Sequence, residues 1–232
     1  MASAAAIVVA GGSSQRMGFD KLRADLNGSP VYRHSLRTLQ DCPEIGQIVL
    51  VASQKNLAEF QSETTQFPKL THVLPGGTER HFSVAAGLEK VAAEFHFIAV
   101  HDAARPLLSP RDLLAVLAAA RTHGAASLAT PVTDTLKRTD ADGFVQEPVD
   151  RTHLWAMQTP QVFQAERLRA AYQKILAVGD IVTDEVSAVA KQGDRVKLVP
   201  AQDPNFKITY SCDIALARLA LTSLSLDEKV ES

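Results

Sequence analysis

Residues 5–21 read AAIVVAGGSSQRMGFDK, an apolar run that leads straight into two glycines and a loop with two cations. A short apolar run bounded by turn residues predicts a buried strand over Ala5–Ala10. Ligands of α/β sheets bind at the carboxyl ends of the strands, where glycines let backbone N–H groups approach a phosphate closely. The loop after this strand is therefore predicted to hold a polyphosphate.

This loop departs from two common phosphate-binding motifs. No Gly-Lys-Ser/Thr follows, as a P-loop requires, and the adjacent Gly11 and Gly12 break the GxGxxG spacing. An ordinary kinase, ATPase or dinucleotide dehydrogenase is therefore disfavoured. Arg16 and Lys21 place two cations on the loop, which suits the charge that develops on a phosphorus with several anionic oxygens. The alternative is a solvated glycine loop whose charges are incidental.

Apolar runs and helical patterns alternate along the chain, which predicts a mostly parallel sheet with helices on both faces. The length of 232 residues suits a single domain over residues 1–232. Further strands are predicted at Gln47–Ala52, His72–Leu74, Phe95–His101, Ala125–Val132, Val196–Pro200 and Asn205–Thr209. Helices are predicted at Val31–Gln40, Leu57–Glu63, Phe82–Glu94, Pro110–His123, Ala165–Ala177, Thr183–Gln192 and from about Cys212. Ser109 is expected to cap the fourth helix and Gly124 to end it.

The alternation breaks at residues 134–152, where two strand-like stretches flank a turn at Asp140–Gly143. This pattern predicts an inserted β-hairpin arm. The arm is too polar to bury both faces, and an isolated two-stranded ribbon is marginal in water. It therefore needs another surface, for which a second subunit is the simplest candidate.

Composition excludes several classes of protein. Lys plus Arg number 24 against 26 Asp plus Glu, so the net charge of -2 argues against a nucleic-acid polymer as partner. No apolar run reaches the roughly 18 residues that span a bilayer, and no basic region precedes the first run, so we expect a cytoplasmic protein without membrane contact. Cys42 and Cys212 lie far apart and are expected to be reduced thiols. The seven histidines are scattered, which disfavours a dedicated zinc site.

Two further polar clusters follow predicted strands. In residues 75–83, PGGTERHFS, Gly77 and Ser83 could hold a base or ribose edge, whereas Glu79 and Arg80 are expected to pair with each other. Asp102 ends a buried strand, where a carboxylate can bind a polyol hydroxyl or a metal ion.

Three later features allow a structural or a functional interpretation. Arg105 either braces its loop or contacts substrate. Residues 183–185, Thr-Asp-Glu, are an N-cap with first-turn acids or part of a site. Lys207 lies among apolar neighbours in a predicted strand, where an unpaired ammonium is costly, so we expect it to face an anion.

Four blocks, in this order and spacing, resemble the 2-C-methyl-D-erythritol 4-phosphate cytidylyltransferases. They are His101–Pro106 (HDAARP), Thr159–Gln161 (TPQ) followed by Phe163, Thr183–Glu185 (TDE) and Asn205–Thr209 (NFKIT). The resemblance implies a Rossmann-like nucleotidyltransferase fold, a three-layer α/β sandwich with a mostly parallel mixed sheet and an inserted β-hairpin dimerisation arm. It further implies CTP and methylerythritol phosphate as substrates, Mg2+ as cofactor, pyrophosphate as by-product, and a homodimer whose arm reaches the neighbouring active site.

The resemblance also assigns roles to residues of this sequence. Arg16 and Lys21 match catalytic cations around the triphosphate, and Lys207 matches an α-phosphate contact. The acceptor-binding positions are Asp102, Thr135, Arg151 and Thr159, of which Thr135 and Arg151 would come from the partner's arm. The nucleotide-binding positions are Ala10, Gly11, Gly12, Gly77, Thr78, Ser83 and Ala103. No protein ligand of the metal is implied.

The sequence departs from the family pattern at two places that bear on the nucleotide. Val9–Ser14 is closer to molybdenum-cofactor guanylyltransferases, and Thr78 stands where an aspartate is common. The alternatives are guanylyl transfer to molybdopterin, cytidylyl transfer to another polyol phosphate such as ribitol 5-phosphate, and nucleotide binding without catalysis.

Overall fold

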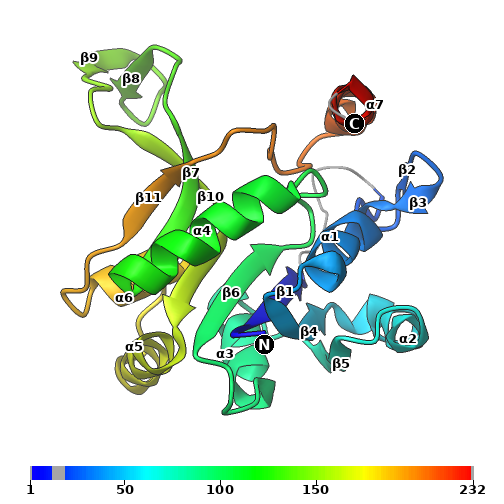
Figure 1. Ribbon diagram of the computed structural model, residues 1–232. Helices are drawn as coiled ribbons and strands as arrows, with labels where there is room; N and C mark the ends of the chain where they lie inside the picture. The colour runs from blue at the N-terminus through cyan, green and yellow to red at the C-terminus, as the bar shows by residue number, and fades with distance from the viewer. Residues whose placement is uncertain (1, 12–18, 231–232) are drawn as a thin grey trace.

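The structure, a computed structural model, describes residues 2–11 and 19–230, with the backbone alone for residues 224–230. Its main sheet has seven strands in the order β11-β7-β10-β6-β1-β4-β5 (Figure 1). These strands are β1 (Ala4–Ala10), β4 (Ile45–Ala52), β5 (Leu70–Pro75), β6 (Phe97–Asp102), β7 (Ala125–Pro131), β10 (Trp155–Gln164) and β11 (Lys197–Pro200). Two short ribbons pair β2 (Asp25–Leu26) with β3 (Ser29–Pro30), and β8 (Leu136–Thr139) with β9 (Val145–Val149). The helices are α1 (Val31–Asp41), α2 (Leu57–Ser62), α3 (Arg80–Lys90), α4 (Pro110–His123), α5 (Ala165–Val178), α6 (Glu185–Ala190) and α7 (Cys212–Val230), with 3-10 turns η2 (Gln54–Asn56) and η3 (Glu63–Thr65).

The predicted mostly parallel mixed sheet is confirmed. The neighbouring pairs β1–β4, β1–β6, β4–β5 and β7–β11 are parallel, whereas β10 runs antiparallel between β6 and β7. β10 is not among the predicted strands, because a proline inside a central strand argues against one. Pro160 is tolerated here because the register of β10 on β7 shifts between Met157 and Gln161, where the ladder is interrupted.

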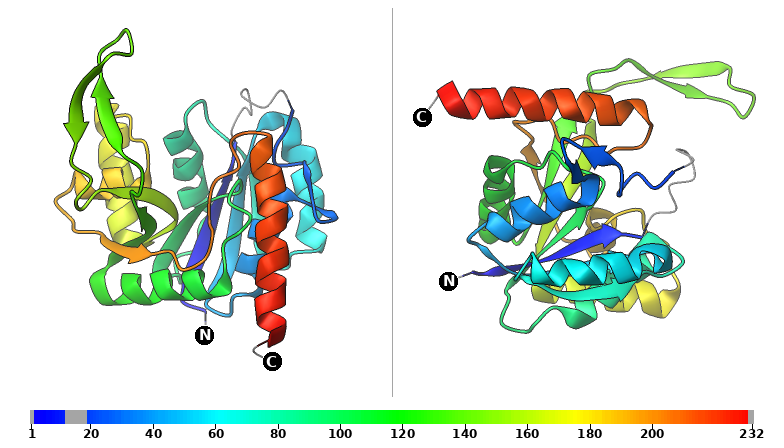
Figure 2. Two further views of the ribbon diagram at one scale, coloured as in Figure 1. Left: turned by 90° about the horizontal axis from the view of Figure 1, so that it is seen from above. Right: turned by 90° about the vertical axis from the view of Figure 1, so that its right-hand side faces the viewer.

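Side-chain alternation along β1 separates two hydrophobic cores. Ala4, Ala6 and Val8 belong to the cluster on one face, whereas Ala5 and Ile7 belong to the cluster on the other. Helices α1, α2, α4 and α7 contribute to the first cluster, and α3, α5 and α6 contribute to the second (Figures 1 and 2). The three layers that the sequence predicts are therefore present.

The ends of α4 are as predicted. The Ser109 hydroxyl accepts a hydrogen bond from the Asp112 N–H at 3.2 Å, Pro110 opens the helix, and Gly124 ends it with a φ of 83°. Asp112 is fully buried, and its carboxylate accepts the backbone N–H of Gln202 at 3.0 Å. This helix therefore anchors the start of the segment that follows β11.

The prediction of a strand at Asn205–Thr209 is wrong. The structure has no strand between β11 and α7, a stretch that it describes in full. The segment is held by isolated contacts, of which the Ile208 N–H to the Ala104 carbonyl, at 2.8 Å, is one. Apolar residues in a sequence indicate burial, as at Ile208, but a segment can be buried outside a sheet as well as within one.

The arm is a separate two-stranded ribbon, as predicted. The Asp140 carboxylate accepts the backbone N–H of Asp142 and of Phe144, and Gly143 adopts a φ of 88° in the turn. Phe144 is 72% exposed and Val145 is 64% exposed, so the tip carries apolar surface. The arm leaves from the end of β7 and stands away from the main sheet (Figure 2).

Over the described part of the chain, no helix is both long enough and apolar enough to cross a bilayer.

Candidate active site

The carboxyl ends of β1, β4, β5 and β6 meet at one edge of the sheet, because these strands run parallel. Asp102 is the last residue of β6 and lies beside Val9, its neighbour on β1. Gly11 follows β1, and Gly76 and Gly77 follow β5. The polar clusters that the sequence places after separate strands are therefore brought to one edge.

Asp102 is the centre of an ion-pair cluster. Its Oδ2 accepts a hydrogen bond from Lys207 Nζ at 2.7 Å, and its Oδ1 accepts bonds from Arg80 Nη2 at 3.2 Å and Nε at 3.3 Å. The Asp102 side chain is only 10% exposed. Burial alone would raise the pKa of Asp102, but the Arg80 and Lys207 cations lower that pKa well below its ordinary value. Asp102 is therefore ionised, and Lys207 faces an anion as predicted.

Arg80 is held on its other side by Glu185. Arg80 Nη1 and Nη2 donate to Glu185 Oε1 and Oε2 at 2.6 and 3.0 Å, and the Tyr172 hydroxyl donates to Oε1 at 2.9 Å. The Glu185 carboxylate is fully buried, so the bidentate guanidinium is what makes its charge tolerable. The expected pair between Glu79 and Arg80 is wrong, because the Arg80 guanidinium turns toward Glu185 and Asp102.

A buried hydroxyl and imidazole lie behind Asp102. Thr159 Oγ1 accepts the Asp102 N–H at 3.0 Å and lies 3.1 Å from His101 Nδ1, while His101 Nε2 lies 3.2 Å from the Arg105 carbonyl. A carbonyl only accepts, so Nε2 carries the proton and Nδ1 accepts from Thr159. Thr159 is thus placed under the Asp102 backbone, and its hydroxyl is engaged inside the protein.

The Thr159–Gln161 block also ties α6 to the site. Gln161 Nε2 donates to Asp184 Oδ2 at 2.9 Å, and Gln161 Oε1 accepts the Val186 N–H at 3.0 Å. Asp184 caps α6 by accepting the Ser187 N–H, which confirms the N-cap interpretation of residues 183–185. Glu185 combines that structural position with a direct pair to Arg80.

The segment that carries Lys207 is braced from both sides. Arg105 Nη1 donates to the Asn205 carbonyl at 2.7 Å, which confirms that Arg105 braces the loop. Asn205 Nδ2 donates to the Thr159 carbonyl at 2.8 Å. Lys21 Nζ donates to the Ile208 carbonyl at 2.8 Å. Lys21, from the start of the chain, is therefore bound to the residue that directly follows Lys207.

The glycine clusters meet around Ser83. The Gly77 N–H donates to Ser83 Oγ at 3.1 Å, and a Cβ added at Gly76 or Gly11 would lie 2.9 or 3.5 Å from that oxygen. Ala103 is buried, with its N–H donated to the Val9 carbonyl at 3.0 Å. Ala10 is also buried, whereas Thr78 is exposed. The backbone of Gly11, Gly76 and Gly77 thus meets at Ser83, and we call it the glycine-rich wall.

Of the remaining four predicted site residues, two lie in the arm and two fall outside the residues that the structure describes. Gly12 and Arg16 fall outside the described residues. Thr135 and Arg151 are exposed at the base of the arm, where the Arg151 guanidinium donates to the Thr133 carbonyl. The arm joins β7 to β10, and β10 is the strand that pairs with β6.

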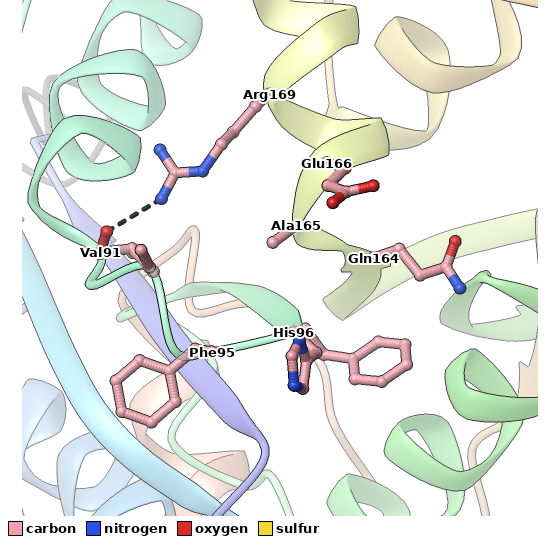
Figure 3. Close-up of a pocket in the computed structure, with 9 residues that line it drawn as sticks. Val91, Phe95, His96, Gln164, Ala165, Glu166 and Arg169 are labelled. Atoms are coloured by element: carbon pink, nitrogen blue, oxygen red, sulfur yellow. Dashed lines mark hydrogen bonds between the residues drawn. The ribbon is translucent and has the colours of Figure 1, made fainter.

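A hollow of about 680 Å3 lies at the opposite edge of the sheet, near the start of β6 and the end of β10 (Figure 3). Phe95, His96, Glu166 and Arg169 line it, and Arg169 Nη2 donates to the Val91 carbonyl at 2.9 Å. None of the predicted site residues is among those that line it.

The sequence does not reveal how Arg80, Tyr172 and Glu185 come together. Each has an ordinary local explanation, and their meeting depends on helices that are far apart in the chain. The only signal is that Arg80 and Glu185 each lie in a polar cluster at the start of a helix.

The arrangement suits transfer between phosphates. Two ammonium groups and an ionised, charge-compensated carboxylate face one edge, beside a glycine-rich wall. The His101 ring is buried and hydrogen-bonded on both nitrogens, so it is not placed to exchange protons with a ligand. Positioning and charge neutralisation are the chemistry that these residues can supply.

The chain is similar to known proteins over nearly its whole length. Residues 4–223 match the family model described as 2-C-methyl-D-erythritol 4-phosphate cytidylyltransferase. A protein of that name from Chromobacterium violaceum is 40% identical over 94% of this chain and 97% of its own, and one from Symbiobacterium thermophilum is 39% identical over 93% and 91%. The crystal structure of 4-diphosphocytidyl-2C-methyl-D-erythritol synthase from Anaerococcus prevotii has a TM-score of 0.84 and 29% identity, over 95% of this chain and 99% of that one. The similarity thus runs from β1 into α7.

The buried imidazole gives a testable pH dependence. Burial, with a smaller contribution from the Arg105 cation, lowers the pKa of His101 from 6.5 to about 4 against the opposing effect of Asp102. The unfolded chain takes up this proton near pH 6.5 and the folded chain only near pH 4, so the free energy of unfolding should fall as the pH drops through that range.

NMR titration of the imidazole, assigned by comparison with His101→Gln, measures this directly. We expect the Nε2–H tautomer and a midpoint near 4. A midpoint near the ordinary value would mean that the ring is open to water and does not support Asp102.

Proposed function

The chain belongs to the 2-C-methyl-D-erythritol 4-phosphate cytidylyltransferase family, and on that premise we propose how its own residues carry out the family reaction. The enzyme transfers CMP from CTP to 2-C-methyl-D-erythritol 4-phosphate and gives 4-diphosphocytidyl-2-C-methyl-D-erythritol and pyrophosphate, a step of non-mevalonate isoprenoid biosynthesis. The observation that carries the residue assignment is the convergence of Lys21 and Lys207 beside the ionised Asp102.

The acceptor's own phosphate is the nucleophile. One of its oxygens forms a bond to the α-phosphorus of CTP while the bond from that phosphorus to the bridging oxygen of the β-phosphate breaks, and pyrophosphate leaves. An alkyl phosphate dianion already has an electron pair to donate near neutral pH, so no general base is needed. Lys21, with Arg16, neutralises the triphosphate, and Lys207 neutralises the α-phosphate as the bond forms.

Asp102 holds the polyol part of the acceptor. Its carboxylate accepts a hydroxyl hydrogen bond, and Arg80 keeps it ionised when Lys207 turns toward phosphate. Thr159 acts through Asp102, because its hydroxyl is engaged with the Asp102 N–H. Thr135 and Arg151 from the partner's arm complete the acceptor site.

The nucleotide lies along the glycine-rich wall. Ala10 and Gly11, with Gly12, approach the phosphates, and Gly77, Thr78, Ser83 and Ala103 surround the cytidine. The Ala103 N–H donates to the Val9 carbonyl, and the Ala103 carbonyl accepts the Ser35 hydroxyl at 3.3 Å, so the second lone pair of that carbonyl is what reads the amino group of cytosine. Reading through fixed main-chain atoms favours cytosine, because another base leaves polar groups unpaired.

Magnesium is the proposed cofactor, held through the nucleotide. Among residues 2–11 and 19–230, no three His, Cys, Asp or Glu side chains gather in a way that could hold a metal ion. Asp102 already faces two cations. Magnesium commonly keeps several waters and binds substrate phosphates, so the triphosphate can carry it. When bound, the ion neutralises phosphate charge.

The assembly is a homodimer built through the arm. Support comes from the exposed apolar tip at Phe144 and Val145 and from the marginal stability of a two-stranded ribbon alone. The compartment is the cytoplasm, which agrees with the free thiols of Cys42 and Cys212.

Pyrophosphate release tests the choice of nucleotide and acceptor. With methylerythritol phosphate, we expect CTP to give at least about 10-fold higher kcat/KM than GTP, ATP or UTP, because only cytosine satisfies the fixed main-chain groups. Ribitol 5-phosphate, tested with CTP, should be a poorer acceptor. Equal release from GTP and CTP would contradict the cytidine assignment, and faster turnover of ribitol 5-phosphate would favour that alternative acceptor.

Subunit mixing tests whether the arm acts in trans. Lys21→Ala and Arg151→Ala should each lower turnover by about 100-fold or more, because each removes a charge that contacts phosphate. A mixed dimer of the two variants then holds one site with both defects and one with neither, so activity should return. Verified mixed dimers that stay inactive would mean that Arg151 serves its own subunit or has no role.

A further inference from the structure

We propose that a hydrogen bond between Asp20 and Asn56 positions Lys21 for catalysis, an inference that rests on the proposed role of Lys21. Asp20 directly precedes Lys21 in the chain. Asn56 belongs to η2, after the carboxyl end of β4, the strand that pairs with β1. The contact thus joins the loop after one strand to the end of its neighbour.

The Asp20 carboxylate is used at both oxygens. Oδ1 accepts the Leu22 N–H at 3.1 Å, which closes a turn around Lys21. Oδ2 accepts Asn56 Nδ2 at 2.6 Å and lies 3.6 Å from Lys55 Nζ. The Asp20 side chain is 12% exposed, so the short bond to Asn56 is largely shielded from water.

Asn56 is a rigid partner for this bond. It is 2% exposed, and its backbone N–H donates to the Ser53 carbonyl at 3.0 Å. Asn56 stands at the N-cap position of α2, yet its side chain makes no capping bond to that helix. An asparagine at an N-cap ordinarily caps, so its use on Asp20 instead indicates a different role.

The second side of Lys21 is fixed by the segment that carries Lys207. Lys21 Nζ donates to the Ile208 carbonyl at 2.8 Å, and the Ile208 N–H is held by the Ala104 carbonyl at 2.8 Å. Lys21 is therefore suspended between the end of β4, through Asp20 and Asn56, and the loop after β6, through Ile208. The distance between the two catalytic lysines depends on both attachments.

A carboxylate beside a triphosphate site opposes phosphate binding, so its presence needs a compensating benefit. The benefit is orientation. The bond to Asn56 holds Asp20 in place, and this sets the direction in which Lys21 leaves the backbone. A displacement of about 1 Å at a catalytic group can cost about 100-fold in rate. The contact should therefore act on kcat through Lys21, and Asp20 and Asn56 are positioning residues.

Reversing the two partners tests the proposal. Asn56→Asp places a second carboxylate against that of Asp20, and the two repel each other. It should lower kcat by about 10-fold or more, with the KM for methylerythritol phosphate changed by less than about 2-fold. The double variant Asp20→Asn/Asn56→Asp restores one donor and one acceptor. The new amide at position 20 can still accept the Leu22 N–H through its oxygen, while its nitrogen donates to the new carboxylate at position 56. We expect kcat to return to within about 3-fold of wild type.

Two controls separate positioning from folding. Lys55→Met removes the longer ion pair to the same Asp20 oxygen and should leave kcat within about 2-fold of wild type. Thermal unfolding midpoints identify a variant that is simply less stable. An unchanged kcat in Asn56→Asp, or a loss that the double variant does not rescue, would overturn the proposal.

A readout independent of turnover distinguishes this proposal from the proposed function. The NMR signal of 13C-methylated Lys21, assigned with Lys21→Arg, should shift in Asn56→Asp and return in the double variant. Wild-type protein that releases no pyrophosphate would contradict the proposed function. The Lys21 signal would still show whether the hydrogen bond between Asp20 and Asn56 sets the position of Lys21. A signal that does not respond to Asn56→Asp would show that this hydrogen bond does not set the position of Lys21.

Discussion

A carboxylate that is nine-tenths buried can remain charged only if cations are brought to it, and Asp102 imposes this constraint on the whole carboxyl edge of the sheet. Arg80 must arrive from α3 and Lys207 from the segment after β11. Arg80 in turn brings the buried Glu185 of α6. One charge at the end of β6 thereby determines how three distant parts of the chain are placed.

The same constraint explains why the conspicuous sequence blocks are mostly supports. Thr159 holds the backbone of Asp102, Gln161 holds the start of α6, and Arg105 and Asn205 hold the segment that presents Lys207. Among the described residues, the groups that remain to meet a ligand at this edge are the ammonium groups of Lys21 and Lys207, which are held by Ile208 and Asp102, the Asp102 carboxylate itself, and the glycine-rich backbone. An enzyme that works by positioning and charge needs little more, because its substrates bring both the nucleophile and the leaving group.

The fold could be predicted where burial and capping act locally, and less well elsewhere. β1 and the ends of α4 follow from residues adjacent in sequence, whereas β10 was obscured by Pro160 and the segment at residues 205–209 imitates a strand. In the site, Asp102 could be predicted because it ends an apolar strand, and Lys207 because an ammonium among apolar neighbours needs an anion. The pair of Arg80 with Glu185 could not, because 105 residues separate its members and each looks like an ordinary helix-start charge.

The most direct measurement is the affinity of Asp102→Asn for the acceptor, determined by calorimetry with a CTP analogue whose α–β bridging oxygen is a methylene group. Asparagine keeps the shape of the side chain and removes the charge that organises Arg80 and Lys207. We expect the Kd for methylerythritol phosphate to rise by about 10-fold or more, as a lost charge-assisted hydrogen bond implies, with the Kd for the CTP analogue changed by less than about 2-fold. Unchanged acceptor affinity, or an equal loss for both ligands, would contradict the central role of this carboxylate.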